Sequence, residues 1–294
     1  MCKTRGPEYS DGRIVQDTGN GATMRYSTIF FDLYGTLFDI HTDEDADAAW
    51  AALADALAEA GGEVGSLDEL RRTFAQVAAP EFAVGGGDPL FEPDYQKVYE
   101  RLVRVTTGAA ADDIGTIRAT EAGHETVGGG AAVAGAMTLT GREISEAAAN
   151  AAWAFRRASE LRLRPYDGAH DLLEKLRRAG LRVVLVSNAQ LPYTMPELEQ
   201  FDLADEFDDI VISSDFGRKK PDPAIFRHAM VLAGVDDPSS VLMVGNDEHA
   251  DIDGARGAGI DGAFLDTFGH GPYDGAVASF AGADYRGLLE FILK

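Results

Sequence analysis

From Pro165 onward, short apolar runs alternate with stretches of helical periodicity, and this alternation constrains the fold more than any other feature. The apolar runs predict strands over residues 183–186, 210–212, 241–244 and 263–265. Helices are predicted over residues 168–179, 197–203, 223–233, 251–258 and 284–293, with glycines at three expected helix ends (Gly180, Gly234 and Gly259). Such alternation indicates an α/β fold with a parallel sheet and right-handed crossovers.

A further strand is predicted near the start of the chain, where residues 29–39 read IFFDLYGTLFD. The run Ile-Phe-Phe is too apolar to stand alone, so we expect it in the same sheet, ending on Asp32. Open α/β sheets bind their ligands beyond the carboxyl ends of the strands. Gly35 lets the chain turn back at once, so that backbone N–H groups can face an anion near Asp32. Tyr34, Gly35 and Thr36 are therefore candidate substrate-binding residues.

The section between these two regions is helical in pattern. Helices are predicted over about 43–60 with Thr42 as the N-cap, after a Ser66 cap, over about 93–105 and over about 142–163. Residues 108–141 lose both periodicity and aromatic bulk, which predicts a flexible insertion. A helical block at this point in the chain projects over the strand tips, where a lid is useful. Residues 1–23, which precede Met24 and the first strand, are expected to be a flexible tail.

Polar residues follow two of the later strands. Ser187 and Asn188 end the run 183–186, and a hydroxyl and an amide at a strand tip can both donate to an anionic oxygen. Lys220 stands just before Pro-Asp-Pro, as the last of three consecutive cations in an acidic chain. An ammonium held there can neutralise charge on a nucleophile and on a group in transfer. These positions favour a bound anion over a solvated basic cluster.

The fourth strand tip is acidic. Asn246, Asp247 and Asp251 follow the run 241–244, and the two aspartates, four residues apart, can share one side of a turn that enters a helix. Oxygen ligands gathered beside Asp32 suit Mg²⁺, which takes a few carboxylates and keeps water or phosphate oxygens. The sequence therefore predicts a Mg²⁺ site built from these four residues.

The overall composition excludes several classes of function. The 26 basic and 49 acidic residues give a net charge of −23, which argues against binding to nucleic acid or to an anionic membrane. A single cysteine, Cys2, allows no intrachain disulfide and no thiol metal site. No apolar run approaches the roughly 18 residues of a membrane span, and the first 25 residues lack the apolar segment of a secretory leader. We therefore expect a cytoplasmic protein with a small-molecule substrate, and the oligomeric state is left open.

Taken together, the four strand-tip motifs make the chain resemble the haloacid dehalogenase superfamily of hydrolases over about 26–41 and 165–270. The resemblance implies a Rossmann-like core (24–41 and 165–294) with a helical cap (42–164) inserted after the first motif. It also implies that Asp32 is the nucleophile, Ser187 the phosphate-binding hydroxyl and Lys220 the charge-neutralising lysine. Asp247 and Asp251 match the acidic fourth motif.

Two positions depart from the phosphatase pattern of that superfamily. Phosphatases usually carry a second aspartate two residues after the nucleophile, whereas this chain has Tyr34, as the dehalogenases do. The acidic fourth motif points the other way, since dehalogenases need no metal. The second departure is Asn246-Asp247 where Gly-Asp is commoner, so either side chain can be the one that meets the ion.

Three functions therefore remain open on these residues. A Mg²⁺-dependent phosphatase that forms an aspartyl-phosphate is favoured. A metal-independent 2-haloacid dehalogenase is the alternative, although the segment after Asp39 offers no arginine of the kind that dehalogenases use. A non-catalytic small-molecule binder on the same fold is the third hypothesis, and a retained nucleophile argues against it.

Overall fold

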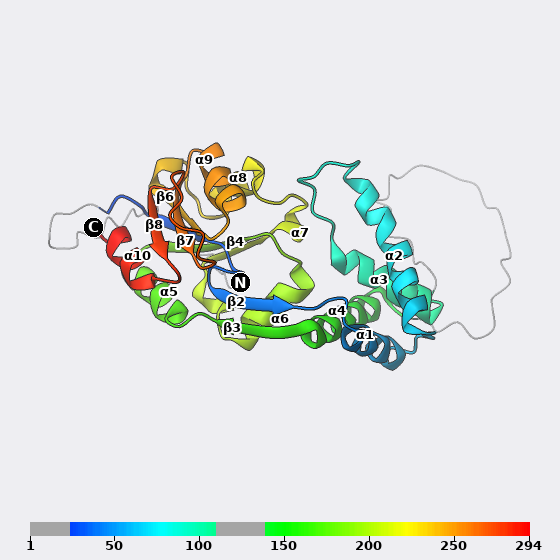
Figure 1. Ribbon diagram of the computed structural model, residues 1–294. Helices are drawn as coiled ribbons and strands as arrows, with labels where there is room; N and C mark the ends of the chain where they lie inside the picture. Colours follow the sequence, from blue (N-terminus) through cyan, green and yellow to red (C-terminus); the bar gives the residue numbers. More distant parts are fainter. Residues whose placement is uncertain (1–23, 110–138) are drawn as a thin grey trace, which may run out of the picture.

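The structure is a computed structural model that describes residues 24–109 and 139–294 (Figure 1). The predicted tail at 1–23 and most of the predicted insertion at 108–141 lie outside the described residues. The main element is a six-stranded sheet in the order β5-β4-β1-β6-β7-β8, with every neighbouring pair parallel. Its strands are β1 (Thr28–Phe31), β4 (Arg182–Ser187), β5 (Asp209–Ile212), β6 (Val241–Gly245), β7 (Asp261–Asp266) and β8 (Ala278–Ala281). The predicted α/β class is confirmed, and β8 is a strand that the pattern analysis missed.

The first strand lies at the centre of this sheet, between β4 and β6. Phe31, the last residue of β1, pairs with Leu185 of β4 and with Val244 of β6. The carboxyl ends of the three strands are therefore nearly level. Asp32 and the residues that follow β4 and β6 all start from the same edge of the sheet, as the strand-tip argument requires.

Helices cover both faces of the sheet because successive side chains of a strand point to opposite sides. Ile29 and Phe31 pack with the apolar faces of α5 (Ala169–Arg178) and α10 (Tyr285–Ile292). Phe30, between them, packs on the other side with α8 (Pro223–Leu232) and α9 (Gly254–Gly257). All three β1 side chains are fully buried, so β1 reads as one continuous apolar run, as expected of a parallel strand covered on both faces.

Two helices of the core begin earlier in the chain than the sequence predicts. The helix expected over 197–203 is α6 (Leu191–Gln200), which has a proline in its first turn. The helix expected over 251–258 is a π-helical turn, η3 (Glu248–Asp253), followed by the short α9, because the Asp247 side chain caps the turn. Three short elements complete the core: α7 (Ser213–Phe216) and the 3₁₀ turns η1 (Ala204–Glu206) and η2 (Pro238–Ser240).

A helical segment leaves the core between two strands of a separate antiparallel pair, β2 (Phe38–Thr42) and β3 (Glu160–Pro165). Its helices are α1 (Asp47–Glu59), α2 (Leu67–Val84), α3 (Tyr95–Thr107) and α4 (Gly141–Ser159). Their buried side chains form an apolar cluster apart from those of the sheet, and Figure 1 shows the four helices gathered at one side. We call the described part of residues 43–159 the helical insert. Among the described residues, no helix combines the length and the apolar character needed to cross a bilayer.

The structure corrects two helix boundaries in this segment. Thr42 is the last residue of β2 and caps nothing; α1 begins at Asp47 after Ala46, without a side-chain cap. The helix predicted over 142–163 ends at Ser159, and residues 160–165 form β3 instead. The alternating Leu-Arg-Leu-Arg pattern of β3 has the two-residue period of a strand, which the alanine-rich helix before it obscured. The Ser66 cap of α2 is confirmed as a capping box with Glu69.

Candidate active site

Asp32 occupies the tip of the central strand. Its backbone N–H donates to the Val244 carbonyl at 2.9 Å, which extends the pairing of β1 and β6 by one residue. Two side chains from the far end of the chain hold the turn that follows by hydrogen bonds to its backbone carbonyls. Thr267 Oγ1 donates to the Gly35 carbonyl at 2.7 Å, and Tyr285 Oη donates to the Thr36 carbonyl at 2.6 Å. Gly35 has a φ of +82°, a conformation that glycine adopts without strain. The nucleophile candidate is thus positioned by a rigid strand end and a fixed turn.

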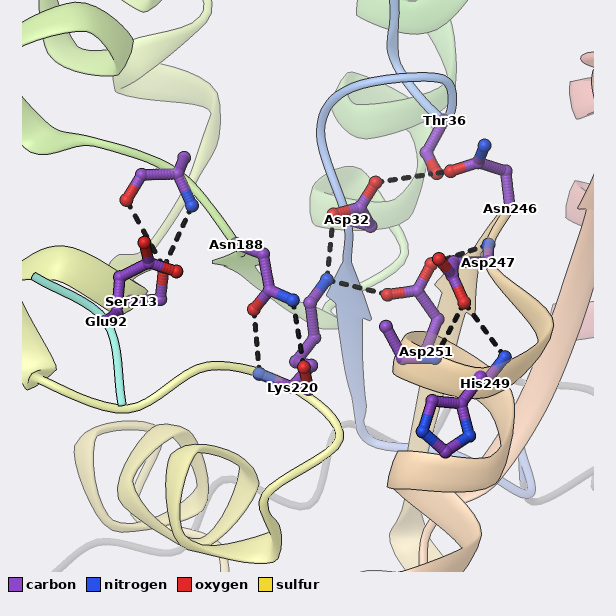
Figure 2. Close-up of polar contacts among 12 residues, drawn as sticks. Asp32, Thr36, Glu92, Asn188, Ser213, Lys220, Asn246, Asp247, His249 and Asp251 are labelled. Carbon is purple, nitrogen blue, oxygen red and sulfur yellow. Dashed lines mark hydrogen bonds and ion pairs between the residues drawn. The ribbon is translucent and has the colours of Figure 1, made fainter. Parts of the chain in front are cut away.

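Lys220 reaches this strand tip and joins two carboxylates. Its Nζ donates to Asp32 Oδ1 at 2.7 Å and to Asp251 Oδ1 at 2.6 Å (Figure 2). Burial by itself would lower the pKa of Lys220, but Asp251 and Asp32 together raise it above its ordinary value, so the amine stays charged. Burial raises the pKa of Asp251 to about 7 against the opposing effect of Lys220. One ammonium therefore holds two buried carboxyl groups together.

Asn188 holds the backbone of Lys220. Its Nδ2 donates to the Lys220 carbonyl at 3.0 Å, and its Oδ1 accepts from the Lys220 N–H at 2.7 Å (Figure 2). Both ends of the amide are therefore engaged, so Asn188 positions the lysine, and its role as a substrate ligand stays a prediction. Ser187 is fully buried at the end of β4, and its hydroxyl has no hydrogen-bond partner among the described residues. A buried hydroxyl without a partner is costly, and a bound anion would satisfy it.

Asp32 Oδ2 and Asn246 Oδ1 each lie 3.1 Å from Thr36 Oγ1, and the single O–H of that hydroxyl donates to one of them at a time. The Asn246 amide packs so closely on Gly35 that a Cβ at that position would collide with it. Asp247, in contrast, points its Oδ1 at the N–H groups of His249 and Ala250, as the cap of η3. Within the described residues no cluster of three or more His, Cys, Asp or Glu side chains forms a metal site. The convergent donor pair is one carboxylate and one amide oxygen, which is a hard-oxygen set suited to Mg²⁺ with its retained waters.

Tyr34 points away from the strand edge into a buried polar network that the sequence did not predict. Its hydroxyl donates to Glu197 Oε2 of α6 and lies 3.0 Å from Thr194 Oγ1. Arg156 of α4 donates from Nε to Glu197 Oε1 at 2.6 Å, and its guanidinium lies 5.6 Å from the centre of the Tyr34 ring. Burial, followed by the charge of Glu197, raises the pKa of Tyr34 well above its ordinary value, so the phenol stays neutral. An arginine of the helical insert thus does lie near the site, although the segment after Asp39 offers none.

The tip of the helical insert touches the core close to Lys220. The Lys219 N–H donates to the Leu90 carbonyl at 3.0 Å, and the Glu92 N–H donates to the Gly217 carbonyl at 3.2 Å. The Glu92 carboxylate accepts from Ser213 Oγ at 3.2 Å and from Gln190 Nε2 at 3.0 Å. These contacts place the connection between α2 and α3 beside the segment that carries the lysine.

A cavity of about 380 Å³ opens over Asp32. The predicted site residues that line it are Asp32, Tyr34, Gly35, Asn188, Lys220, Asn246, Asp247 and Asp251. Ser187 and Thr36, which were also predicted, are fully buried and are not among the residues that line it. Further lining residues that the sequence reading missed are Asp39, Ile40, Arg162, Tyr166, Ala250 and Phe268. The two-residue period of β3 was the one signal that could have placed Arg162 on a strand.

A carboxylate at the tip of a central parallel strand, bonded to a buried lysine beside a second carboxylate, makes this cavity the candidate active site. A profile of the haloacid dehalogenase-like hydrolases matches residues 26–259, and the chain belongs to this family.

Several relatives of known activity match part of the chain. It is 35% identical over 127 residues to a phosphoglycolate phosphatase of Pseudomonas putida, which is 42% of this chain and 46% of that protein. It is 36% identical over 101 residues to a phosphoserine phosphatase of Thermus thermophilus, which is 34% of this chain and 40% of that protein. The chain thus spans less than half the length of these two curated relatives.

Two solved structures share the fold. A 2-haloacid dehalogenase from Pseudomonas syringae superposes with a TM-score of 0.55 at 20% identity, over 92% of this chain and 100% of that one. A HAD phosphatase from Thermococcus onnurineus gives 0.51 at 19% identity, over 90% of this chain and 97% of that one. At this identity the likeness concerns the fold alone.

Proposed function

We propose that the protein is a Mg²⁺-dependent phosphatase that acts on a small phosphorylated metabolite. The observation that carries this proposal is the shared bond of Lys220 to Asp32 and Asp251, which provides a carboxylate nucleophile beside a fixed positive charge. The names of the relatives of known activity, which are phosphatases of small metabolites, favour this chemistry over dehalogenation. A cytoplasmic location and the absence of a nucleic-acid or membrane partner stay predictions of the sequence.

In this mechanism an oxygen of Asp32 attacks the phosphorus atom, the bond from phosphorus to the leaving oxygen breaks, and that oxygen takes a proton from solvent water to leave as an alcohol. A water molecule then attacks the phosphorus of the aspartyl-phosphate and gives its proton back to solvent, which releases inorganic phosphate and regenerates the Asp32 carboxylate. Lys220 offsets charge on the phosphoryl oxygens, and the free Ser187 hydroxyl donates to one of them. Asn188 keeps the lysine in place through its two bonds to the lysine backbone.

Asp32 and Asn246 are the residues that would hold Mg²⁺, with Asp247 and Asp251 beside them. Their oxygens fit the ion, since Asp32 Oδ2 and Asn246 Oδ1 already converge on one hydroxyl. When bound, the ion supplies neutralisation of the phosphoryl charge. The Thr36 hydroxyl lies within hydrogen-bond distance of both oxygens and so sits where the two converge.

The helical insert is proposed to act as a cap. It contacts the core at the segment beside Lys220 and through Arg156, and it follows the nucleophile in the chain. A segment in this place can cover the strand tips and exclude water from the aspartyl-phosphate until the leaving group has departed.

The second candidate function is 2-haloacid dehalogenation, which Tyr34 and the nearby Arg156 guanidinium favour. In that reaction Asp32 displaces halide from carbon, and water hydrolyses the ester without a metal. Two of the three nitrogens of the Arg156 guanidinium are already paired, Nε with Glu197 at 2.6 Å and Nη1 with Glu44 at 3.1 Å. This pairing leaves the arginine less able to receive a halide.

Phosphate release from a panel of phosphorylated metabolites, with Mg²⁺ and with EDTA, tests the proposal beside halide release from 2-chloropropionate. We expect metal-dependent phosphate release and no halide release.

Asp32→Asn should lower phosphate release by about 10³-fold or more, since the nucleophile is lost. Asp215→Asn, which removes an exposed carboxylate of α7, is the matched control and should leave the rate unchanged. Halide release that persists in EDTA would replace the proposal with the dehalogenase. Turnover of neither kind would favour the non-catalytic binder.

A further inference from the structure

Arg162 shares the cavity over Asp32 without taking part in the proposed phosphoryl chemistry. Among the described residues that line this cavity, the lysine and arginine side chains are Lys220 and Arg162. The Lys220 side chain is 1% exposed and already bonded to two carboxylates. Because Lys220 and the strand tips serve the phosphoryl group, a second negative group in the same cavity would meet Arg162.

Among the described residues, Asp39 holds Arg162 by one edge of its guanidinium. Its Nε lies 2.8 Å from Asp39 Oδ1, across the pair of strands β2 and β3. The other Asp39 oxygen, Oδ2, is taken by Arg164 Nη2 at 3.2 Å. Both Asp39 oxygens are therefore engaged by arginines, and the contact with Oδ1 orients Arg162. Within the described part of the chain, the two Nη groups of Arg162 have no acceptor, and the side chain is 54% exposed. A guanidinium anchored in this way offers two N–H donors to an incoming carboxylate.

Apolar and aromatic side chains also line the cavity: Ile40, Tyr166 and Phe268, the last of them 65% exposed. A volume of about 380 Å³ corresponds to a sphere roughly 9 Å across, which suits a small ligand and not a long one. A cavity of this size has room for a phosphoryl group at Asp32 and for a short carbon skeleton whose second charged group meets Arg162.

We propose that Arg162 forms a second anion subsite, so that the preferred substrate is a small phosphate monoester that also carries a carboxylate a few bonds away. This inference rests on the proposed phosphatase function, which it makes more specific. The carboxylate accepts hydrogen bonds from the two Nη groups, and Asp39 is the positioning residue that orients them. Neutral sugar phosphates lack the group that Arg162 recognises and should bind less well.

Arg164 provides a matched control for this proposal. It lies on the same strand and donates to the same carboxylate as Arg162, but it does not line the cavity. A purely structural role in bracing β2 against β3 would make the two arginines equivalent. A role in substrate recognition would separate them.

The test compares wild type, Arg162→Gln and Arg164→Gln on two esters of similar size, with added Mg²⁺. One ester is 2-phosphoglycolate, and the other is 2-hydroxyethyl phosphate, called the neutral ester here because a hydroxyl replaces the carboxylate. For Arg162→Gln we expect kcat/KM on the acid to fall by about 10- to 100-fold, mainly through KM, because a charge-assisted bond to substrate is lost. Its kcat/KM on the neutral ester should stay within about threefold of wild type. Arg164→Gln should resemble wild type on both. Equal losses on the two esters, or no loss on the acid, would overturn the subsite.

A binding measurement separates this inference from the proposed function. The binding measurement compares Asp32→Asn with the double variant Asp32→Asn, Arg162→Gln by titration calorimetry with 2-phosphoglycolate. The Kd of the double variant should be at least about tenfold higher than that of Asp32→Asn. Binding of inorganic phosphate should be unaffected. If wild type releases phosphate from neither ester, the wider panel of phosphorylated metabolites decides the proposed phosphatase, and this binding measurement alone decides the subsite. Binding of the acid that does not depend on Arg162, or no binding at all, then refutes it.

Discussion

Lys220 is the residue whose identity matters most for both stability and chemistry. It is the cation that faces Asp32 and Asp251 in a buried setting, where an uncompensated charge is expensive. The sequence predicted all three residues from their places at strand tips. It could not predict that one amine bonds both carboxylates, since Asp32 and Lys220 are 188 positions apart and meet only through the sheet register.

Lys220→Met should remove phosphate release and lower the free energy of unfolding by about 3–5 kcal/mol, because it leaves two buried carboxylates facing each other. Urea unfolding followed by fluorescence measures the loss. The double variant Lys220→Met, Asp251→Asn removes one of those carboxylates and should recover much of the stability, but not the activity. A single variant as stable as wild type would contradict the shared ion pair.

Tyr34 lines the site as the sequence predicts, but its hydroxyl takes a role that the sequence did not indicate. The sequence placed it near the substrate, and it does line the cavity. Its hydroxyl is nevertheless committed to Glu197 and Thr194, which lie on a helix about 160 residues further along the chain. No local pattern marks Glu197 or Arg156 as partners of Tyr34, because their contact depends on how the helical insert packs on α6.

At the level of elements, boundaries were predicted well where a local signal ends the helix or strand. Ser66 begins α2 with a capping box, and Gly180, Gly234 and Gly259 follow helix ends with positive φ. The boundary between α4 and β3 was missed because alanine-rich helix and alternating strand run directly into each other. The consequence reaches the site, since β3 carries Arg162.

The connection between α2 and α3 should respond to pH through Glu92. Burial raises the pKa of Glu92, so folding favours its protonated form. Its contribution to stability is full below the unfolded value of 4.5 and is lost as pH rises through the raised folded pKa. From about pH 4 to pH 7, wild type should therefore lose stability relative to Glu92→Gln. Denaturant unfolding at several pH values measures this difference.

An exposed residue of the helical insert supplies the control for this prediction. Glu63→Gln removes a carboxylate that lies on the surface, and its stability relative to wild type should not vary with pH in the same way. A constant difference between Glu92→Gln and wild type across the range would show that the Glu92 carboxyl is not buried against Ser213 and Gln190.

For the molecule as a whole, the helical insert and the core are joined by a buried ion pair. The Arg156 side chain is 8% exposed and that of Glu197 0%, and their bond connects α4 with α6. The same arginine lies over the rings of Tyr34 and Tyr193. The helical insert is therefore linked through Arg156 to Tyr34, in the turn that follows Asp32.

Arg156→Met should lower the free energy of unfolding by about 3–5 kcal/mol, because Glu197 is left buried without its partner. Arg142→Met is the control on the same helix, since its pair with Glu146 is exposed and should contribute no more than about 0.5 kcal/mol. Urea unfolding of both variants checks the contrast. Equal losses would mean that the buried pair does not link the two parts of the molecule.

The sequence by itself determined the α/β class, the parallel sheet and the four strand tips that carry polar residues. These follow from local periodicity and turn residues, which act over a few positions of the chain. The tertiary structure alone decided which side chains meet. It bonds Lys220 to two carboxylates and Tyr34 to Glu197, and it places Arg162 in the lining of the cavity over Asp32. Such contacts join residues many positions apart, so they depend on strand register and on the packing of the helical insert, which no local pattern encodes.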